Sequence, residues 1–545
     1  MVAEPGGVRV PLAACLCAPA RFAACTAPGP AARRAAEREA LARMQQAEST
    51  VEHGTRLIVV VAGVSIAAVM QFLDSTIVNV ALPTIGGNLG ASFDEIGWVV
   101  TAYSLAAIGV IPLTGWLALR FGRKRYFVFS IVGFTLASAL CGLSTSFGAL
   151  LVSRVIQGLF GGGLVATSQS ILVSSFPRER QAVAQGIFAL IAVLGPGLGP
   201  TVGGWLTDQF SWPLIFFINL PLGVFCVLAL VPTLKESPTQ RRPVDVLGIF
   251  LLVSGLACLQ YFLERGEIKQ WFDDDGIRAC AAWAAIALPW FVVHALRTPH
   301  PVLELRTLRH RNLAFASLAT FALGANLFGS LLVLPLYLQN SLGFTALLAG
   351  TVLFLRTLPT ALLTPIGTFL LQRGIVSARA AAAFGLGTLA VGTYLLSAGV
   401  TPVSDAGIFV PGMLVVGVAF AFLWTPLGFI ALRSLPPPEI GYGAAIWNLS
   451  AQVGGSVSIA AITTLQDRRQ AFWWDALASR LQLGNHAIAT LPSHDLVHHV
   501  IPRLAGLVAA QSAVLTYRDL LLLLAIVPLA AIPFVLLTKS RRATA

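Results

Sequence analysis

The stretch Gly195-Pro196-Gly197-Leu198-Gly199-Pro200-Thr201-Val202-Gly203-Gly204 decides the fold class of this chain. Two prolines and five glycines stand within these ten residues, inside a long apolar run from about Gln181 to Asp208. In water this composition would stop a helix, because proline lacks a backbone donor and glycine favours the unfolded chain. In a bilayer, neighbouring helices satisfy the freed backbone groups. The stretch therefore predicts a bent, closely packed transmembrane helix.

The composition of the whole chain agrees with a membrane location. Of its 545 residues, 56% are hydrophobic and 11% are charged, and the mean hydropathy is +0.79. So little charge cannot cover a water-soluble globule of this size. The net charge of +12 does not indicate nucleic-acid binding, because the basic residues lie in short loops between apolar runs, as is typical of membrane orientation. The seven cysteines have neither disulfide nor metal-ligand spacing, and we expect structural thiols.

Fourteen apolar runs follow one another when roughly 20 residues is taken as the length of a span. They lie near 57–83, 96–118, 126–146, 149–175, 181–207, 213–233, 244–263, 279–296, 313–338, 346–371, 380–398, 408–432, 440–465 and 519–538. Basic residues gather in the short loops on the side of the N-terminus, while the short loops on the other side hold Arg265, Lys269 and Arg278. This asymmetry predicts that both termini lie in the cytoplasm.

The runs fall into two halves with related motifs. Pro112–Gly122 ends the second run and Pro365–Gly374 ends the tenth, and both place glycines seven apart with an arginine before the second glycine. This repetition predicts an all-α polytopic membrane protein of two six-helix halves with a two-helix central insert. The expected parts are a disordered cytoplasmic tail at 1–56, a first half at 57–233, the insert with its flanking loops at 234–312, a second half at 313–538 with a long outer loop near 466–518, and a cytoplasmic tail at 539–545. Met44 is an alternative translation start.

The first run contains an acidic residue, Asp74, within the segment Leu73–Pro83. An ionisable group at this depth costs about 2.5–3.5 kcal/mol on insertion scales, so its default interpretation is functional. Desolvation favours the neutral carboxyl and a nearby cation favours the charged one, which lets such a group switch with its surroundings. The alternative is a carboxylate that caps a helix kink or braces a neighbouring helix.

Two arginines also lie within apolar runs. Arg154, Gln157, Gly158 and Gly161 fall on one face of the fourth helix, so an arginine, an amide and two small residues look inward together. Arg154 either bonds backbone carbonyls or takes part in proton coupling. Arg356 stands before Pro359 in the tenth run, where it is either a snorkelling or structural cation or a substrate-facing one.

Neutral amides add further polar groups to the spans. Most such amides bind helix to helix, and a minority contact substrate. The candidates for the substrate or the cavity are Asn79, Gln157, Asn219, Asn326, Arg356 and Asn448. Three histidines near the end, His494, His498 and His499, lack the cysteines or carboxylates of a metal site, so no metal is expected. The sequence contains no nucleophile elbow, phosphate-binding loop or zinc helix motif, which argues against an enzyme and against ATP as energy source.

From about residue 57 to 540 the chain resembles the major facilitator superfamily, and within it the fourteen-span drug:proton antiporter branch of the EmrB/QacA type. The segment Leu73–Pro83 is similar to the acidic motif of the first helix, and Arg154–Gly158 to the fourth-helix motif. The loop Gly115–Arg125 resembles the motif between helices 2 and 3, and Phe216–Gly223 is likewise typical. The corresponding candidate residues are Gly115, Arg120, Gly122, Arg123 and Lys124 in the loop, and Gly195, Pro196, Gly199, Pro200, Gly203 and Gly204 in the fifth-helix antiporter motif.

Three departures mark a divergent member. Leu119 stands where the loop usually has an aspartate, which puts an acidic latch at that loop in doubt. Pro213 and Ala451 replace arginines that relatives often carry.

The resemblance implies alternating access between two halves, with the extra helices at about 244–296 outside the transport core and the antiporter motif as a packing surface between the halves. It implies proton-coupled efflux of lipophilic drugs or other toxic small molecules across the inner membrane, with Asp74 and Arg154 in proton coupling and no cofactor besides protons. A periplasmic adaptor protein and an outer-membrane channel are candidate partners. The alternatives are export of an endogenous metabolite such as a siderophore or an aromatic acid, and a non-transporting membrane receptor or scaffold.

Overall fold

The computed structural model describes residues 54–91, 93–177, 180–237, 239, 243–436, 439–479 and 501–538. The expected tails up to residue 53 and at 539–545, the alternative start Met44 and the three histidines near the end lie outside this part. All regular elements of the described residues are helical, and fourteen of the helices are long and apolar enough to cross a membrane. The chain is therefore an all-α, multi-pass membrane protein, and the predicted number of spans is confirmed.

Several spans consist of two helices that meet at a glycine, a proline or a short turn. The first half comprises α2 (Thr55–Leu89), α4 (Trp98–Val110) with α5 (Thr114–Phe121), α6 (Arg123–Gly142), α7 (Phe147–Gly161) with α8 (Leu164–Ser175), α9 (Gln181–Gln209), and α10 (Leu214–Phe217) with α11 (Asn219–Thr233). The insert comprises α12 (Val246–Arg265) and α13 (Asp275–Arg297). The second half comprises α14 (Arg311–Leu336), α15 (Ala346–Phe354) with α16 (Thr357–Gln372), α17 (Ala378–Ala398), α18 (Val410–Ala421) with α19 (Trp424–Arg433), α20 (Ile440–Ala478) and α23 (Ile501–Leu536). Short elements are α3 (Phe93–Ile96), η1 (Ile111–Leu113), η3 (Trp271–Asp273), η4 (Leu305–Arg309), η5 (Tyr337–Ser341) and η6 (Ala406–Phe409).

The glycine-rich stretch forms part of α9, which continues through both prolines. Gly195, Gly199 and Gly203 recur every four residues and so lie on one face of the helix, and this face packs on α2. A Cβ atom at Gly195 would lie 2.5 Å from Cβ of Phe72, and one at Gly203 would lie 2.6 Å from the carbonyl oxygen of Ile77. The close packing is as predicted. This glycine face lies within the first half, because α2 and α9 both belong to it. The expected contact between the halves is made by another face of the stretch, where a Cβ atom at Gly197 would lie 2.9 Å from Oγ1 of Thr357 in the second half.

The two halves meet along other faces of α9 and along α20. Besides α2, α9 contacts α15, α16 and α19 of the second half, while α20 contacts α5 and α8 of the first half. We refer to the two ends of the helix bundle by the ends of α2, as the Thr55 end and the Leu89 end.

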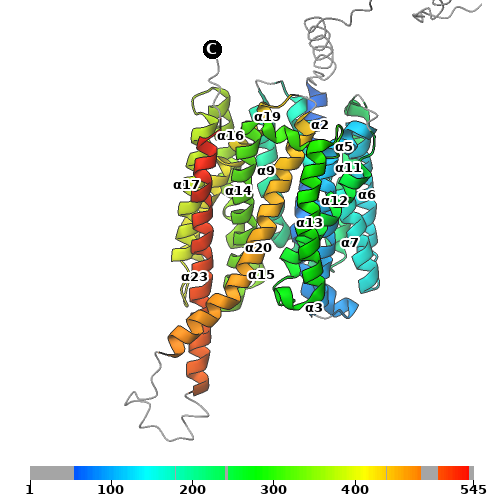
Figure 1. The fold of residues 1–545 in the computed structure, drawn as a ribbon. Helices are drawn as coiled ribbons and strands as arrows, with labels where there is room; N and C mark the ends of the chain where they lie inside the picture. Colours follow the sequence, from blue (N-terminus) through cyan, green and yellow to red (C-terminus); the bar gives the residue numbers. More distant parts are fainter. Residues whose placement is uncertain are drawn as a thin grey trace, which may run out of the picture. The chain divides into compact units, whose positions relative to one another are not determined.

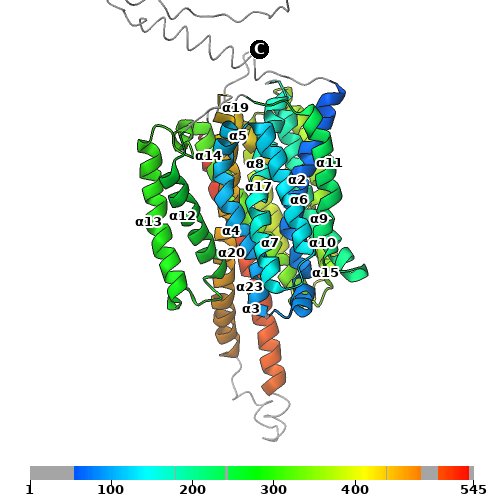
Figure 2. The ribbon, with the colours of Figure 1, turned by 90° about the vertical axis from the view of Figure 1, so that its right-hand side faces the viewer.

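The two inserted helices have different surroundings. α13 packs mainly on α12, whereas α12 also packs against α4 of the first half and α20 of the second. Figure 2 shows α13 at the edge of the bundle, with α12 between it and α4 and α20. The expectation that both extra helices lie outside the core therefore applies to α13 and is wrong for α12.

α20 and α23 continue beyond the other helices at the Leu89 end (Figures 1 and 2). The expected outer loop near 466–518 is therefore helical at 466–478 and at 501–518. Trp473 donates from Nε1 to Oδ2 of Asp519 at 2.9 Å, and Nε of Arg469 lies 3.8 Å from the same oxygen. Hydropathy places the end of a span where charged residues begin. Here α20 continues past that point, because its polar side chains pair with those of α23.

Candidate functional site

The side chain of Asp74 is fully buried in α2 and is held by three donors. Arg154 donates from Nη1 to Oδ2 at 2.7 Å, and Gln157 donates from Nε2 to Oδ1 at 2.8 Å. Asn219 of α11 donates from Nδ2 to the same Oδ1 at 3.1 Å. Charge-assisted hydrogen bonds of this kind are about twice as strong as neutral ones. These three donors stabilise the carboxylate form of Asp74 at membrane depth.

Arg154 is 1% exposed and uses its remaining groups as well. Its Nε donates to the carbonyl oxygen of Val99 at 3.0 Å, and Nη1 also lies 2.7 Å from Oε1 of Gln157. The guanidinium carbon is 4.2 Å from the centroid of the Tyr103 ring, within the range of a cation–π contact. Arg154 therefore bonds a backbone carbonyl, which is one of the two roles that the sequence left open, and it also pairs with the Asp74 carboxylate. Its part in proton coupling stays a prediction.

Small residues on the same face of α7 bring this helix close to α4. A Cβ atom at Gly158 would lie 2.8 Å from Cβ of Ala106, and one at Gly161 would lie 2.7 Å from the hydroxyl of Tyr103. The inward face predicted for Arg154, Gln157 and the two glycines is therefore present.

Ser138 of α6 is a member of this cluster that sequence reasoning missed. It accepts from Nδ2 of Asn219 at 3.0 Å and donates to the carbonyl oxygen of Phe216 at 2.9 Å. A single serine in an apolar helix carries no signal of its own, so only the fold identifies it.

A central cavity of about 440 Å³ lies beside this cluster. Its polar lining residues include Gln71, Ser75, Asn79, Tyr103, Ser104, Gln260, Glu264, Gln339, Asn448, Gln452 and Ser456, and its aromatic ones are Phe72, Tyr103, Phe328 and Trp424. Asp74 and Arg154 do not line it. Tyr103 belongs to both sites, because it lines the cavity and its ring also lies against the guanidinium of Arg154.

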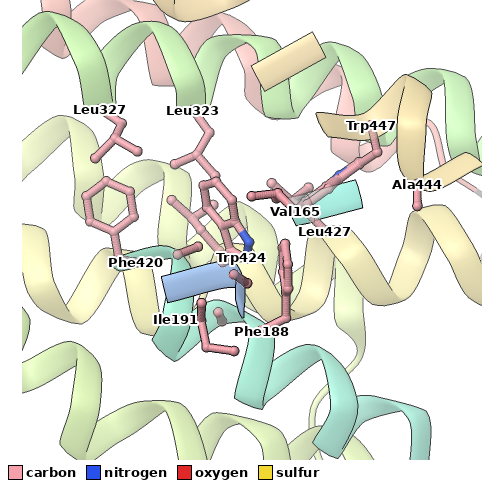
Figure 3. Close-up of a cluster of buried hydrophobic side chains, with 14 of the residues drawn as sticks. Val165, Phe188, Ile191, Leu323, Leu327, Phe420, Trp424, Leu427, Ala444 and Trp447 are labelled. Carbon is pink, nitrogen blue, oxygen red and sulfur yellow. The ribbon is translucent and has the colours of Figure 1, made fainter. Parts of the chain in front are cut away.

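Aromatic and aliphatic side chains close the cavity toward the Thr55 end. Figure 3 shows Trp424 of α19 at the centre of this cluster, with Phe188 and Ile191 of α9 on one side and Leu323 of α14 on the other. The ring centroids of Trp424 and Trp447 are 5.3 Å apart. The residues of α2 that line the cavity lie between Gln71 and Pro83, on the Leu89 side of the cluster. The two halves are thus in contact at one end of the cavity.

A chain of amides links the halves at the same level. Asn448 of α20 donates from Nδ2 to Oε1 of Gln169 in α8 at 2.6 Å. Gln169 in turn donates from Nε2 to Oε1 of Gln185 in α9 at 3.1 Å. Asn448 is thus both a cavity residue, as expected, and a bridge between halves.

The other candidates lie in different places. Asn79 has an exposed side chain in the cavity. Asn326 is buried away from it and donates from Nδ2 to Oγ1 of Thr393 at 3.2 Å and to the carbonyl oxygen of Leu524 at 2.9 Å, so it joins helices. Arg356 is 1% exposed, lies 5.9 Å from the Phe420 ring centroid and does not line the cavity. The structure thus does not bring Asn326 and Arg356 to the cavity.

The loop motif lies at the Thr55 end, where the two halves touch. A Cβ atom at Gly115 would lie 3.1 Å from the backbone nitrogen of Tyr442 at the start of α20. Gly122 has a φ of +94°, which suits glycine. The guanidinium of Arg120 lies 5.4 Å from the Trp116 ring centroid.

Glu236, after α11, supplies a carboxylate to this loop. Its Oε1 accepts from the backbone nitrogen of Lys124 at 3.1 Å, and its Oε2 lies 3.4 Å from Nε of Arg125. Arg123 donates from Nη1 to Oγ of Ser174 at 2.6 Å. The loop motif therefore has an acidic partner from elsewhere in the chain, although Leu119 stands at the usual position of the acid.

Sequence reasoning also missed Glu264, a cavity residue on α12. It stands just past the apolar run at 244–263 and beside Arg265, which the sequence places in a short loop, so nothing in the sequence marks it as a cavity residue. Among the described residues no group of three His, Cys, Asp or Glu side chains is arranged to hold a metal ion, and Cys141, Cys226, Cys258 and Cys280 are free thiols.

Comparisons with known proteins agree with this architecture. Residues 64–459 match the family model of the Major Facilitator Superfamily. The chain is 34% identical over 420 residues to the multidrug export protein EmrB of Escherichia coli (strain K12), which covers 76% of this chain and 81% of the relative. It is 33% identical over 422 residues to the fatty acid resistance protein FarB of Neisseria gonorrhoeae, covering 77% and 82%. Among solved structures, the human organic anion transporter MFSD10 shares the fold, with a TM-score of 0.57 and 16% identity over 87% of this chain and 100% of that chain.

Proposed function

The chain belongs to the major facilitator superfamily, in the branch that contains EmrB, and on this premise we propose that it is a proton-coupled exporter of lipophilic toxic small molecules. The family and the fold identify a transporter rather than an enzyme. The observation that supports the proton coupling is the buried Asp74–Arg154 pair, whose arginine lies against Tyr103, a residue of the cavity wall.

The chemistry that we propose for this pair is a switch between two protonation states. The charged carboxylate is stabilised by Arg154, Gln157 and Asn219. When a proton binds Asp74, Arg154 loses its counter-charge but keeps the carbonyl oxygen of Val99 and the ring of Tyr103. Without its ion pair the guanidinium is held only by these two contacts, and we propose that its shift toward them moves Tyr103 and with it the cavity wall. Alternating access couples the switch to transport if the two protonation states favour different packing of the halves.

We assign the Thr55 end to the cytoplasm, with both termini inside the cell, because the basic residues of the short loops gather there. The conformation with Trp424 and Trp447 packed together is then the one that releases substrate outside and accepts a proton. The membrane is the inner membrane under this proposal, and a periplasmic adaptor protein with an outer-membrane channel remains the candidate partner.

Export of an endogenous metabolite, such as a siderophore or an aromatic acid, is the second candidate. The name of FarB, a fatty acid resistance protein, favours an acidic substrate. The cavity disfavours it, because the charged side chain among its described lining residues is a carboxylate, Glu264. We therefore retain the first proposal.

The Asp74→Asn variant tests the function. Asparagine keeps the size and one acceptor but cannot exchange a proton, so we expect ethidium efflux driven by an imposed pH gradient in proteoliposomes to fall at least tenfold. Asp208→Asn, at the exposed end of α9, is the matched control and keeps the wild-type rate. Size-exclusion profiles establish that both variants fold. An Asp74→Asn protein that expels ethidium at the wild-type rate against the gradient contradicts the proposal.

A further inference from the structure

The inserted helix α12 forms part of the cavity wall. It packs against α4 of the first half and α20 of the second (Figure 2). Gln260 and Glu264 stand four residues apart, so they lie on one face, and both line the cavity. A helix outside the two six-helix halves therefore contributes polar groups to the space that we assign to substrate.

The carboxyl group of Glu264 is only half satisfied. Its Oε1 accepts from Nε2 of Gln260 at 2.5 Å. Its Oε2 is buried and has no hydrogen-bond partner among the described residues, although the hydroxyls of Thr101 and Ser104 lie near the group. A buried polar atom without a partner is costly and indicates a missing ligand or proton. This carboxylate thus differs from Asp74, whose two oxygens accept three hydrogen bonds.

The nearest cation is the next residue, Arg265, which is also in contact with other groups. Its guanidinium carbon lies 4.7 Å from the centroid of the Trp98 ring, and it does not line the cavity. Its positive charge partly offsets that of Glu264, but the cavity itself receives only the carboxylate.

The remaining lining of the cavity favours a positive ligand. Among the described lining residues, Glu264 alone has an acidic or basic side chain of the Asp, Glu, Lys, Arg or His type; the others are apolar, aromatic or neutral polar. Phe72, Tyr103, Phe328 and Trp424 supply ring faces, which attract cations through their quadrupoles. An apolar pocket with a few placed polar groups is the usual form of a small-molecule site.

We propose that α12 belongs to the substrate site and that the Glu264 carboxylate binds the positive charge of a lipophilic organic monocation. The inference rests on the proposed function, since it takes the cavity to be the transport cavity. Two carboxylates then have separate roles: Asp74 exchanges protons behind Tyr103, and Glu264 selects cations over neutral and anionic molecules of the same size.

Equilibrium binding to the full-length chain in lipid nanodiscs tests this assignment. The probes are tetraphenylphosphonium, a lipophilic monocation, and triphenylphosphine oxide, a neutral molecule of related shape. We expect Glu264→Gln to weaken tetraphenylphosphonium binding at least tenfold and to change binding of the neutral probe less than twofold. Glu264→Asp keeps the charge and restores part of the loss.

Glu267→Gln is the matched control. Glu267 stands three residues further along, accepts from Nε1 of Trp271 and does not line the cavity, so its variant binds both probes as the wild type does. The assignment is overturned if Glu264→Gln binds tetraphenylphosphonium with unchanged affinity, if both probes weaken equally, or if the wild type does not bind the cation.

The binding assay separates this inference from the proposed function. Binding is measured without a pH gradient, so it reports the site and not the coupling to protons. If Glu264 determines binding but no proton-driven flux occurs, the proposed function fails and the present assignment stands. If flux occurs and Glu264→Gln leaves cation binding unchanged, the reverse holds.

Discussion

Arg154 contacts a carboxylate, a backbone carbonyl and an aromatic ring at the same time. The first two contacts need an N–H group pointing at an oxygen, and the third needs the cation above the ring. The guanidinium can make all three contacts, because its donors point in fixed directions and its charged plane can stack on an aromatic ring. The charge that it compensates, Asp74, comes from another helix, so the pair also joins α2 to α7. A buried ion pair adds little stability over an apolar replacement, but loss of one partner leaves an uncompensated charge.

We therefore predict that Arg154→Leu destabilises the protein by about 3–5 kcal/mol, because it leaves Asp74 charged and buried. Adding Asp74→Asn to this variant recovers a large part of the loss, since no buried charge then remains. Thermal unfolding of the wild type, both single variants and the double variant in detergent gives the coupling between the two positions. Strictly additive effects would show that the two side chains do not act as a pair.

At the scale of helices, α9 is fitted to α2 by its glycines rather than by polar bonds. A side chain at Gly203 would meet the carbonyl oxygen of Ile77, which cannot move without separating the two helices. Gly204 is the next residue, but a Cβ atom there would lie 3.7 Å from Cγ1 of Val80, an ordinary contact. Gly203 therefore does not tolerate a larger side chain, whereas Gly204 in the same motif does.

We expect Gly203→Val to abolish ethidium efflux and to lower the melting temperature, because α2 also carries Asp74. Gly204→Ala, as the control, keeps both near the wild-type values. Efflux in proteoliposomes and thermal unfolding of the purified protein measure the two effects. Equal behaviour of the two variants would contradict the assignment of the glycine face to α2.

At the scale of the whole membrane unit, the cavity is closed at the Thr55 end by side chains from both halves. Trp447 is fully buried there and packs edge-to-face on Trp424 and against Phe188 of the first half. Gly115 against Tyr442 and the amide chain from Asn448 to Gln185 add further contacts between halves. Apolar burial therefore stabilises this closure, and it weakens when the buried area is reduced.

We predict that Trp447→Ala shifts the protein toward a state with the Thr55 end apart. Arg125 and Arg373 are exposed and lie in different halves. Spin labels attached to cysteines at these two positions measure the distance between the halves by pulsed electron paramagnetic resonance. The population at long distance grows in Trp447→Ala and stays unchanged in Trp474→Ala, which removes a partly exposed tryptophan from the same helix. An unchanged distance distribution in the Trp447 variant would mean that this cluster does not hold the halves together.

The parts of the fold that follow from membrane thickness could be predicted, and those that depend on the arrangement of helices could not. The fourteen spans follow from hydropathy because a fixed hydrocarbon thickness sets their length. Asp74 and Arg154 could be singled out because charge within a span is costly. Glu264 could not, because a charge at the end of a run faces water or a cavity depending on neighbours that one sequence does not reveal. For the same reason, the sequence alone could not predict that α12 lines the cavity or that Glu236 bonds the loop motif.

The continuity of α20 has a mechanical consequence. This single helix begins at the contact with Gly115, passes the cavity at Asn448 and Gln452, and ends at Ala478, where only α23 accompanies it beyond the other described helices. From Trp447 to Ala478 it is roughly 45 Å long at 1.5 Å per residue, so a tilt of about 10° at its base would displace its tip by about 8 Å. The helix acts as a lever: a small rotation of α20 at the closed end displaces its tip by several ångströms on the opposite side of the bundle. A fluorophore at the tip would therefore report each turnover from outside the membrane.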